Sequence, residues 1–534
     1  MTTTNAPSIA SGPPLATVAG LCPGPRIDDP LRRAAERVPD RPALRTTARD
    51  LTFGDLDARA TRVGAALAAL LGEPGVVAMA MVLDPAFALA FYGIARSGHV
   101  SALVNPLLRP DGLVHVLATS GARAAIVPPE VYDRLCAVRD RLPELRDLIL
   151  TAPDDAHPGV RSLESLERHG ERLPPVSLDA DSDAVACLQF TSGTTGAPKA
   201  VRLTHRNLTV NAAQTIHGHQ LTDESVLFNY LPTFHLMHLS IGVAAMASHV
   251  LFPEEDTPAA ATAARRFHAT HLYSLPVRLA RMAADPRLVR ERVPTLRAIM
   301  SGGSALRPDH AETLARHFGV PVVQGFGLAE TSPCTHLGVL DRPKAGSSGV
   351  LVPGAECRIV DIDTGAVVPI GETGELHVKG PQLMAGYLGR DLDADLEPGG
   401  WFATGDIAFL DEDGYLFVVD RIKDVFKRDN WLVAPGRIEA VLLRHPDVAE
   451  CVVFDHPDEF CGAVAHALVV PVGGSLDPAA VAEFVNGQVP YFERVEHVDV
   501  VTAIPRSPTG KVSRRDLRRT VVEAADRRGG IPIA

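Results

Sequence analysis

The chain has 534 residues, of which 46% are hydrophobic and 22% are charged. This length exceeds one ordinary domain and predicts two or more. The formal net charge is −12 and no basic block interrupts the chain, which argues against a general nucleic-acid binder and against a protein that docks on anionic membranes. The composition is that of a globular protein.

The seven cysteines are widely spaced and form no CxxC pair, so we expect buried thiols in a reducing compartment. Residues 1–26 are rich in Thr, Ala, Pro and Gly and lack the basic start and apolar core of a signal peptide. We expect them to form a flexible leader. No apolar run approaches the roughly 20 residues that span a bilayer, which predicts a cytoplasmic protein without a membrane span.

Short apolar runs alternate with helical patterns from residue 27 to about 323. The first are a buried strand at 76–83, a helix at 85–96 and a strand at 100–104. Strands separated by helices predict parallel sheets with crossover connections, and their number predicts two doubly wound α/β subdomains. Further strands are expected at 124–127, 148–150, 184–190, 226–231, 271–275 and 296–300.

The pattern changes after about residue 344. Residues 345–420 carry short strands and turn sequences such as Asp411-Glu-Asp-Gly414, which predict a small antiparallel β-barrel that completes an N-terminal domain over 27–420. The remaining residues, 421–534, are long enough for a small α+β domain of their own. Helices are expected there at 436–444 and 478–487, and strands at 450–454, 465–471 and 495–501.

The strongest motif directly follows the strand expected at 184–190. It reads Phe190-Thr-Ser-Gly-Thr-Thr-Gly-Ala-Pro-Lys199. Its two glycines permit a tight backbone with inward amides, and its hydroxyls and ammonium add donors for phosphate oxygens. The spacing differs from that of a Walker A motif. The sequence therefore predicts a polyphosphate-binding loop made of Thr191, Ser192, Gly193, Thr194, Thr195, Gly196 and Lys199.

Further motifs follow in a fixed order. They are Leu231-Pro-Thr-Phe-His235, Ser301-Gly-Gly-Ser304, Gly325-Phe-Gly-Leu-Ala-Glu330, Gly374-Glu-Leu376, Trp401-Phe-Ala-Thr-Gly-Asp406, Asp420-Arg-Ile-Lys-Asp424 and Pro505-Arg-Ser-Pro-Thr-Gly-Lys511. Together with the phosphate loop, this set resembles the signature of the adenylate-forming superfamily of acyl- and aryl-CoA synthetases, peptide-synthetase adenylation domains and luciferases. The resemblance runs from about residue 30 to the end of the chain.

The resemblance implies a two-step reaction. ATP first converts an acid to an acyl adenylate with release of pyrophosphate, and a second nucleophile then takes the acyl group and releases AMP. By the same resemblance, ATP and Mg²⁺ are cofactors, CoA is the default co-substrate, and the last domain is a mobile lid. The partners would be small molecules and the protein a monomer or homodimer, and the composition fits a bacterial enzyme of secondary metabolism.

The resemblance also assigns roles to single residues. Lys511 would bridge the acid carboxylate and the α-phosphate, Lys427 would support it, and Lys423 would be the hinge of the last domain. Glu330 would lie beside Mg²⁺, as a hard carboxylate ligand should, and Asp406 would accept both ribose hydroxyls. The other nucleotide-binding residues would be Gly302, Ser304, Gly325, Phe326, Gly327 and Arg421.

The acyl pocket is expected around His235, which would gate it and take part in catalysis. Leu236, Met237, Gly303 and Gly327 would line it. The pair His235 and His238 has the spacing of metal ligands but no third ligand nearby in the sequence, so packing or gating is the preferred interpretation of His238.

Four positions depart from the common family pattern. Ala329 stands where a threonine usually precedes the motif glutamate. Asp429 and Asn430 replace the Lys or Gly and the Gly of many CoA ligases, and Leu432 replaces a polar residue. A carboxylate at position 429 would repel CoA phosphates, so these changes weaken the prediction of the acceptor more than that of adenylation.

Three functions therefore remain open. The leading one is an AMP-forming ligase that activates an aryl or medium acyl acid and transfers it to CoA. An alternative keeps adenylation but uses an amine or a carrier-protein thiol, or activates nitrite to diazotise an arylamine. A non-catalytic nucleotide-binding scaffold is disfavoured because Lys511 and Asp406 are both present.

Only six of the 52 basic residues are lysine. Four of them, Lys199, Lys423, Lys427 and Lys511, fall in the motifs, whereas Lys344 and Lys379 have no expected role. The arginine bias predicts that lysine is kept where a compact ammonium must reach one oxygen.

We therefore expect Lys511→Arg to lose adenylation, by about 100-fold or more if one contact to the developing charge is lost. Acid-dependent exchange of pyrophosphate into ATP measures this step directly. Near-normal exchange in the variant would show that the arginine bias carries no such information.

Overall fold

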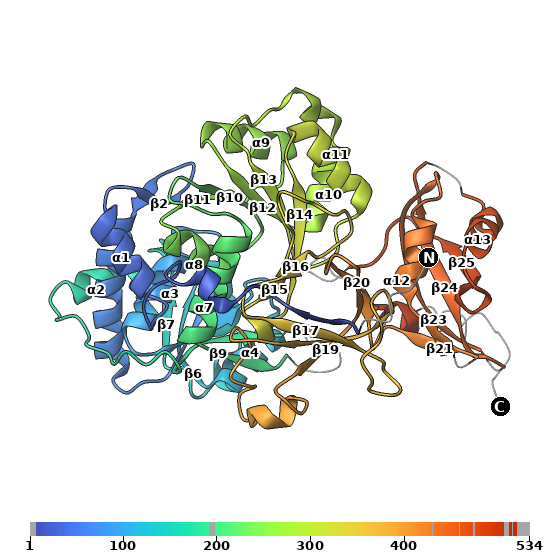
Figure 1. The fold of residues 1–534 in the computed structure, drawn as a ribbon. Coiled ribbons are helices and arrows are strands. Elements are labelled where there is room, and N and C mark those ends of the chain that lie inside the picture. Colours follow the sequence, from blue (N-terminus) through green and yellow to red (C-terminus); the bar gives the residue numbers. More distant parts are fainter. Residues whose placement is uncertain are drawn as a thin grey trace.

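The computed structural model describes residues 7–191, 198–429, 431–458, 460–473, 476–506, 512–514 and 516–520 (Figure 1). Its α/β class, with a large N-terminal domain and a small C-terminal one, confirms the fold expected from the sequence. In the described ranges, no helix is long and apolar enough to cross a membrane.

The first sheet has six strands in the order β7-β6-β4-β5-β8-β9, parallel except for β9 at the edge. Its central strands are mostly apolar because buried cores lie on both faces. Its strands are β4 (Val76–Ala80), β5 (Val100–Val104), β6 (Ala122–Val127), β7 (Asp147–Leu150), β8 (Val185–Phe190) and β9 (Ala200–Thr204).

The second sheet has nine strands in the order β16-β15-β14-β13-β12-β10-β11-β2-β3, with a parallel centre and antiparallel edges. A large apolar core lies between the two sheets. The strands are β2 (Pro42–Arg45), β3 (Asp50–Thr52), β10 (Val226–Tyr230), β11 (Ser248–Leu251), β12 (His271–Ser274), β13 (Ala298–Ser301), β14 (Val322–Gly327), β15 (Cys334–Leu337) and β16 (Val350–Leu351).

Helices pack on both sheets, and most of them begin with a proline in the first turn, where its missing N–H costs nothing. They are α1 (Asp29–Arg37), α2 (Phe53–Leu71), α3 (Pro85–Arg96), α4 (Pro110–Ser120), α5 (Pro129–Cys136), α6 (Leu163–Gly170), α7 (His205–Gly218), α8 (Leu236–Ala244), α9 (Thr257–Arg266), α10 (Pro276–Ala284) and α11 (Pro308–Phe318).

The third sheet has five antiparallel strands in the order β1-β17-β18-β19-β20. Its turns fall where the sequence indicated: the Asp411 carboxylate accepts from the backbone N–H groups of Asp413 and Tyr415 and so closes the β19–β20 hairpin. The strands are β1 (Ile9–Ser11), β17 (Glu356–Val360), β18 (Gly374–Lys379), β19 (Phe402–Leu410) and β20 (Leu416–Arg421).

The segment expected as a flexible leader is in part built into this sheet. β1 pairs with Glu356–Arg358 of β17, and the Ser8 hydroxyl donates to the Pro369 carbonyl. The expectation failed because an edge strand needs only a few residues with free backbone groups, which a composition rich in Thr and Ala does not reveal.

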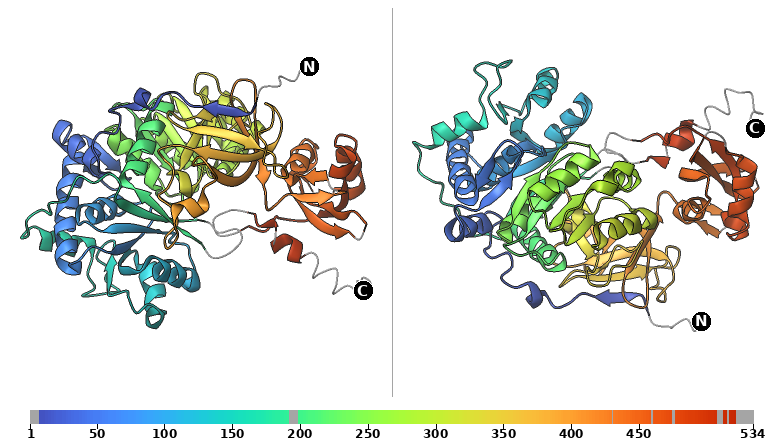
Figure 2. Two further views of the ribbon diagram at one scale, coloured as in Figure 1. Left: turned by 60° about the horizontal axis from the view of Figure 1, so that its bottom comes forward. Right: turned by 90° about the horizontal axis from the view of Figure 1, so that it is seen from above.

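The last part of the chain lies at one end of the molecule (Figures 1 and 2). It begins with the hairpin of β21 (Phe426–Arg428) and β22 (Trp431–Val433), followed by a three-stranded sheet with its own apolar core. Its other elements are α12 (Pro435–Leu442), β23 (Val448–Asp458), β24 (Gly462–Pro471), α13 (Pro478–Asn486) and β25 (Val495–Val500).

Candidate active site

The predicted motifs directly follow the carboxyl ends of parallel strands. The phosphate loop follows β8, the His235 motif follows β10, the 301–304 loop follows β13, and the 325–330 motif ends β14. Ligands bind at this edge in open α/β sheets. The two sheets meet there, because the Gln189 side-chain amide of β8 lies 3.4 Å from Nε2 of His235.

The phosphate loop is closed at its neck by reciprocal hydrogen bonds. The backbone N–H of Thr191 donates to the Lys199 carbonyl at 3.0 Å, and the N–H of Lys199 donates to Oγ1 of Thr191 at 3.1 Å. The remaining predicted loop residues, Ser192, Gly193, Thr194, Thr195 and Gly196, lie outside the described residues.

A tyrosine that no motif indicated connects this loop to Glu330. The Tyr387 hydroxyl donates to Oε1 of Glu330 at 2.7 Å, and Nζ of Lys199 lies 4.5 Å from the centre of the Tyr387 ring. The backbone of Glu330 is held by Met384, whose N–H donates to its carbonyl at 2.8 Å. The structure therefore joins Lys199 and Glu330, which are distant in sequence, through one aromatic side chain.

Asp406 and Arg421 face each other across the β19–β20 pair. They are register partners, and Nε of Arg421 lies 2.6 Å from Oδ1 of Asp406. The Asp406 side chain is only 2% exposed, and its Oδ2 has no hydrogen-bond partner among the described residues. A buried carboxylate oxygen without a donor is costly, so this atom is suited to a ligand hydroxyl.

Burial, helped by the carboxylates of Glu330 and Glu375, raises the pKa of Asp406 to about 6 against the opposing charges of Arg421 and Lys423. The electrostatic influence of Glu330 and Lys423 on Asp406 also means that the three predicted residues share one region.

The loops expected around adenine have the backbone features that require glycine. Gly303 has φ of 88°, a left-handed conformation. A Cβ on Gly327 would lie 1.9 Å from the Pro333 carbonyl oxygen. Phe326 precedes Gly327 in β14, and its ring lies 6.3 Å from that of His336. Gly302 and Ser304 belong to the loop that follows β13, and Gly325 belongs to β14.

His235 is the N-cap of α8, and its Nδ1 accepts from the N–H of Met237 at 3.2 Å. Burial lowers the pKa of His235 to about 4, so the ring is neutral at pH 7, and because Nδ1 accepts a backbone N–H, its proton lies on Nε2. Burial also holds the pKa of His238 well below its usual value. Both histidines are therefore neutral hydrogen-bonding groups.

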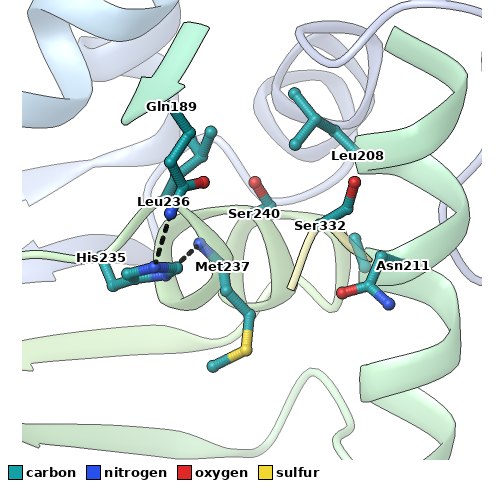
Figure 3. Close-up of a pocket in the computed structure, with 9 residues that line it drawn as sticks. Gln189, Leu208, Asn211, His235, Leu236, Met237, Ser240 and Ser332 are labelled. Carbon is teal, nitrogen blue, oxygen red and sulfur yellow. Dashed lines mark hydrogen bonds between the residues drawn. The ribbon is translucent and has the colours of Figure 1, made fainter. Parts of the chain in front are cut away.

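A pocket lies beside His235, between α7 and α8 (Figure 3). The side chains that line it are uncharged at neutral pH, and two of them, Ser240 and Ser332, have buried hydroxyls without a partner among the described residues. Ser332 has φ of 71°, which residues other than glycine rarely adopt. The lining is Gln189, Leu208, Asn211, Ala212, His235, Leu236, Met237, Ser240 and Ser332.

One of the predicted lysines, Lys427, is not brought to this region. Nζ of Lys427 lies 3.1 Å from Oδ1 of Asp363, in an exposed turn of the third sheet. Lys511 lies outside the described residues. Of the lysines without an expected role, Lys344 is paired with Asp411 and Asp413.

The AMP-binding enzyme family model matches residues 31–388, and the model of the AMP-binding enzyme C-terminal domain matches residues 437–511. The chain belongs to the AMP-binding enzyme family. It is therefore an enzyme, an AMP-forming ligase of the acyl-CoA synthetase type.

Similar proteins support this membership over nearly the whole chain. A 4-coumarate–CoA ligase 5 of Oryza sativa subsp. japonica is 32% identical and covers 88% of this chain and 90% of its own length. The structure of the anthranilate CoA ligase AuaEII with anthranoyl-AMP has a TM-score of 0.84 and 26% identity, and covers 94% of this chain and 98% of its own. ATP-bound MatB from Rhodopseudomonas palustris has the same TM-score and identity, with coverage of 93% and 99%.

Asp406→Asn should stabilise the free enzyme near neutral pH. Because the folded-state pKa, about 6, is above the usual 3.8, the folded state binds this proton more tightly. Stability from this group is therefore complete below about pH 4 and is lost as the pH rises to about 6. Asparagine removes that loss, so we expect a gain of about 1–3 kcal/mol at pH 7.5 that shrinks toward pH 4.5.

Denaturant unfolding at several pH values measures this difference. Asp363→Asn, in an exposed turn, is the matched control and should show no such pH-dependent gain. A variant at position 406 that is less stable than the native chain at pH 7.5 would contradict the expected penalty of burying this carboxylate.

Proposed function

We propose that the chain activates a hydroxy- or amino-substituted aryl acid as its adenylate and transfers it to CoA. The observation that carries the first step is the buried Asp406 carboxylate, with Arg421 on one oxygen and no partner among the described residues on the other. Two vicinal ribose hydroxyls supply the missing donors.

The nucleotide would extend from this carboxylate toward Lys199. Ribose would sit at Asp406 and Arg421, adenine at Phe326 and the 301–304 loop, and the phosphates at Glu330 and the loop that begins at Thr191. The continuous series Lys199, Tyr387 and Glu330 supports this direction. Lys511 would carry the charge that develops on the α-phosphate, where a positioned cation lowers the barrier most.

Glu330 is the residue suited to hold Mg²⁺ together with phosphate oxygens. Among the described residues, no group of three or more His, Cys, Asp or Glu side chains could hold a metal alone, and Mg²⁺ at phosphate sites usually needs only one or two carboxylates. The ion would supply charge neutralisation along the triphosphate. Tyr387 keeps the Glu330 side chain oriented by its hydrogen bond.

The acid would bind beside His235 and direct its substituent into the pocket there, whose free volume of about 10 Å³ is that of a single water-sized group. Its lining offers only neutral groups, so it suits neither a second carboxylate nor a cationic tail, whereas its unpartnered hydroxyls favour a neutral polar substituent. Two of the relatives are named for 4-coumarate and anthranilate, which are aryl acids with a hydroxyl or an amino group. Leu236 and Met237 would contact the ring.

The acceptor we propose is CoA, which the names of the relatives support. A second candidate, an amine or another acceptor that lacks CoA's phosphates, is favoured by Asp429. This residue forms the β21–β22 turn with φ of 49°, and its N–H donates to the Cys461 carbonyl. Its carboxylate would repel phosphates that pass the turn.

We also propose that the chain divides near residue 421, after β20, and that residues 421–534 swing about Lys423 between the two half-reactions. The separate core of the last part of the chain supports this division. Such a movement lets one chain present different residues for adenylation and for transfer.

The experiment is a panel of acids tested for pyrophosphate exchange, and for AMP release with and without CoA. We expect exchange with 4-coumarate or anthranilate, little with benzoate, octanoate or malonate, and a CoA thioester detected by mass spectrometry. Lys511→Ala is the inactive control. Pyrophosphate exchange without formation of a CoA thioester would indicate that the acceptor is an amine or a carrier-protein thiol. It would also fit nitrite as the activated acid and an arylamine as the acceptor. No exchange with any acid would refute the proposal.

Tyr387→Phe tests the orientation of Glu330. The variant keeps the ring beneath Lys199 but loses the hydroxyl that donates to Glu330. We expect the Mg²⁺ concentration for half-maximal exchange to rise by about ten-fold, since one charge-assisted hydrogen bond is worth about 1.5–3 kcal/mol. Tyr415→Phe, beside Lys344 in the third sheet, is the control and should leave the Mg²⁺ dependence unchanged.

A further inference from the structure

One guanidinium joins the last domain to the third sheet. Arg514 donates from Nε to the Val453 carbonyl at 2.9 Å, from Nη1 to Asp420 at 3.0 Å and to Asp424 at 3.4 Å, and from Nη2 to both oxygens of Glu439 at 2.9 and 3.0 Å. An arginine has five N–H donors, and these contacts match that number.

The partners of Arg514 come from both sides of the junction. Asp420 belongs to β20 of the third sheet, whereas Glu439 and Val453 belong to α12 and β23 of the last domain. The last domain holds Asp420 a second time, because the Gly436 N–H donates to its Oδ2 at 2.7 Å. The Asp420 side chain is 2% exposed, so this contact is buried.

Other side-chain contacts between described residues across this junction lie at the surface. They include Arg307 to the Ala449 carbonyl at 3.1 Å, Arg437 to Oγ1 of Thr373 at 3.4 Å and Lys427 to Asp363 at 3.1 Å. Exposed contacts of this kind contribute little to stability because water screens them. Among these described contacts, those of Asp420 are therefore the ones that can fix the orientation of the domain.

The cluster holds more negative than positive charge. Asp420, Asp424 and Glu439 face the single cation of Arg514. Burial raises the pKa of Asp420 and of Glu439, and Arg514 opposes this. Without the guanidinium the three carboxylates would repel one another in a poorly solvated site. The junction therefore depends on Arg514 more than on any one of its partners.

We propose that Arg514 is a positioning residue for adenylation: it clamps the last domain to Asp420 and so fixes the segment that carries Lys511. This inference rests on the proposed function, because it assigns the adenylation step to Lys511. Lys511 lies three residues before Arg514 in the sequence, so an anchored Arg514 restricts where that ammonium can reach. Misplacement by about 1 Å can cost about 100-fold in rate.

The clamp is adjacent to the nucleotide residues in the same strand. Successive side chains of a strand point to opposite faces, and in β20 Arg421 faces Asp406 while Asp420 faces Arg514 and Gly436. A nucleotide that binds Arg421 would therefore contact β20, the same strand whose Asp420 is bound by Arg514.

The test uses the full chain with Arg514→Gln and Arg514→Lys. Arg518→Gln is the matched control, because Arg518 pairs at 2.6 Å with Asp455 within the last domain. With the acid that is active on the native enzyme, we expect pyrophosphate exchange to fall by about 10- to 100-fold in kcat. The KM for ATP should change less than about three-fold, because Asp406 and Arg421 are intact, and lysine should not rescue, since it lacks the fork.

Hydrogen exchange read by mass spectrometry provides a measurement that needs no substrate. We expect faster exchange in Arg514→Gln at 416–424 and at 434–442, where the Gly436 amide is bonded to Asp420, and native exchange in the control. Two results would overturn the inference: an equal loss of activity in Arg514→Gln and in the Arg518→Gln control, or a native kcat in Arg514→Gln.

Asp420→Asn provides a second test in case Arg514→Gln fails to fold. It removes only the charge that crosses the junction and should lower kcat in the same direction with an unchanged midpoint of thermal unfolding. Native kcat in Asp420→Asn would overturn the inference. If the native enzyme shows no exchange with any acid, the proposed function fails instead, and hydrogen exchange still decides whether Arg514 holds the junction.

Discussion

The pairing of β19 with β20 is the constraint on which both halves of the site depend. Its register sets Asp406 opposite Arg421 and Ile407 opposite Asp420. Because side chains alternate along a strand, neighbouring residues of β20 serve different surfaces. Arg421 pairs with the buried Asp406 carboxylate, and Asp420 accepts hydrogen bonds from the last domain. A slip of one residue in this register would reverse both assignments.

Burial of these carboxylates has an energetic consequence for the free enzyme. Asp406 has one oxygen without a described donor, and its raised pKa means that its ionised form is held at a cost. A bound ligand with two hydroxyls would remove that cost, so binding energy and stability are linked at one atom. Active sites commonly retain such destabilising groups because their function needs them.

Much of the fold could be predicted because buried parallel strands leave a clear signal. The apolar runs at 76–83, 100–104 and 184–190 became β4, β5 and β8, within a few residues. β3 (Asp50–Thr52) and β11 (Ser248–Leu251) gave no such run, because they are short and carry polar residues. β1 was expected as a leader, since a three-residue edge strand is fixed by its partner β17 and not by its own composition.

The site divides in the same way. The motifs identified residues whose type and spacing are local, such as Lys199, Glu330 and Asp406, and the resemblance gave their roles. The sequence analysis did not identify Tyr387 or Arg514, because their contacts are with residues 57 and 94 positions away, Glu330 and Asp420. No local pattern marks a tyrosine or an arginine that closes such a long-range contact.

The described contacts of the lysines show what the scarcity of lysine in this chain does and does not indicate. Lys199 lies over the Tyr387 ring, as Lys344 lies over that of Tyr415, and Lys379 lies 5.8 Å from the Trp401 ring. Lys344 also bridges two carboxylates of the β19–β20 turn. Lysine in this chain is therefore kept for compact contacts of structural as well as chemical use, and an arginine bias alone does not separate the two. What distinguishes Lys199 is its position: it follows a parallel strand at the edge where ligands bind, whereas Lys344 packs on a hairpin turn.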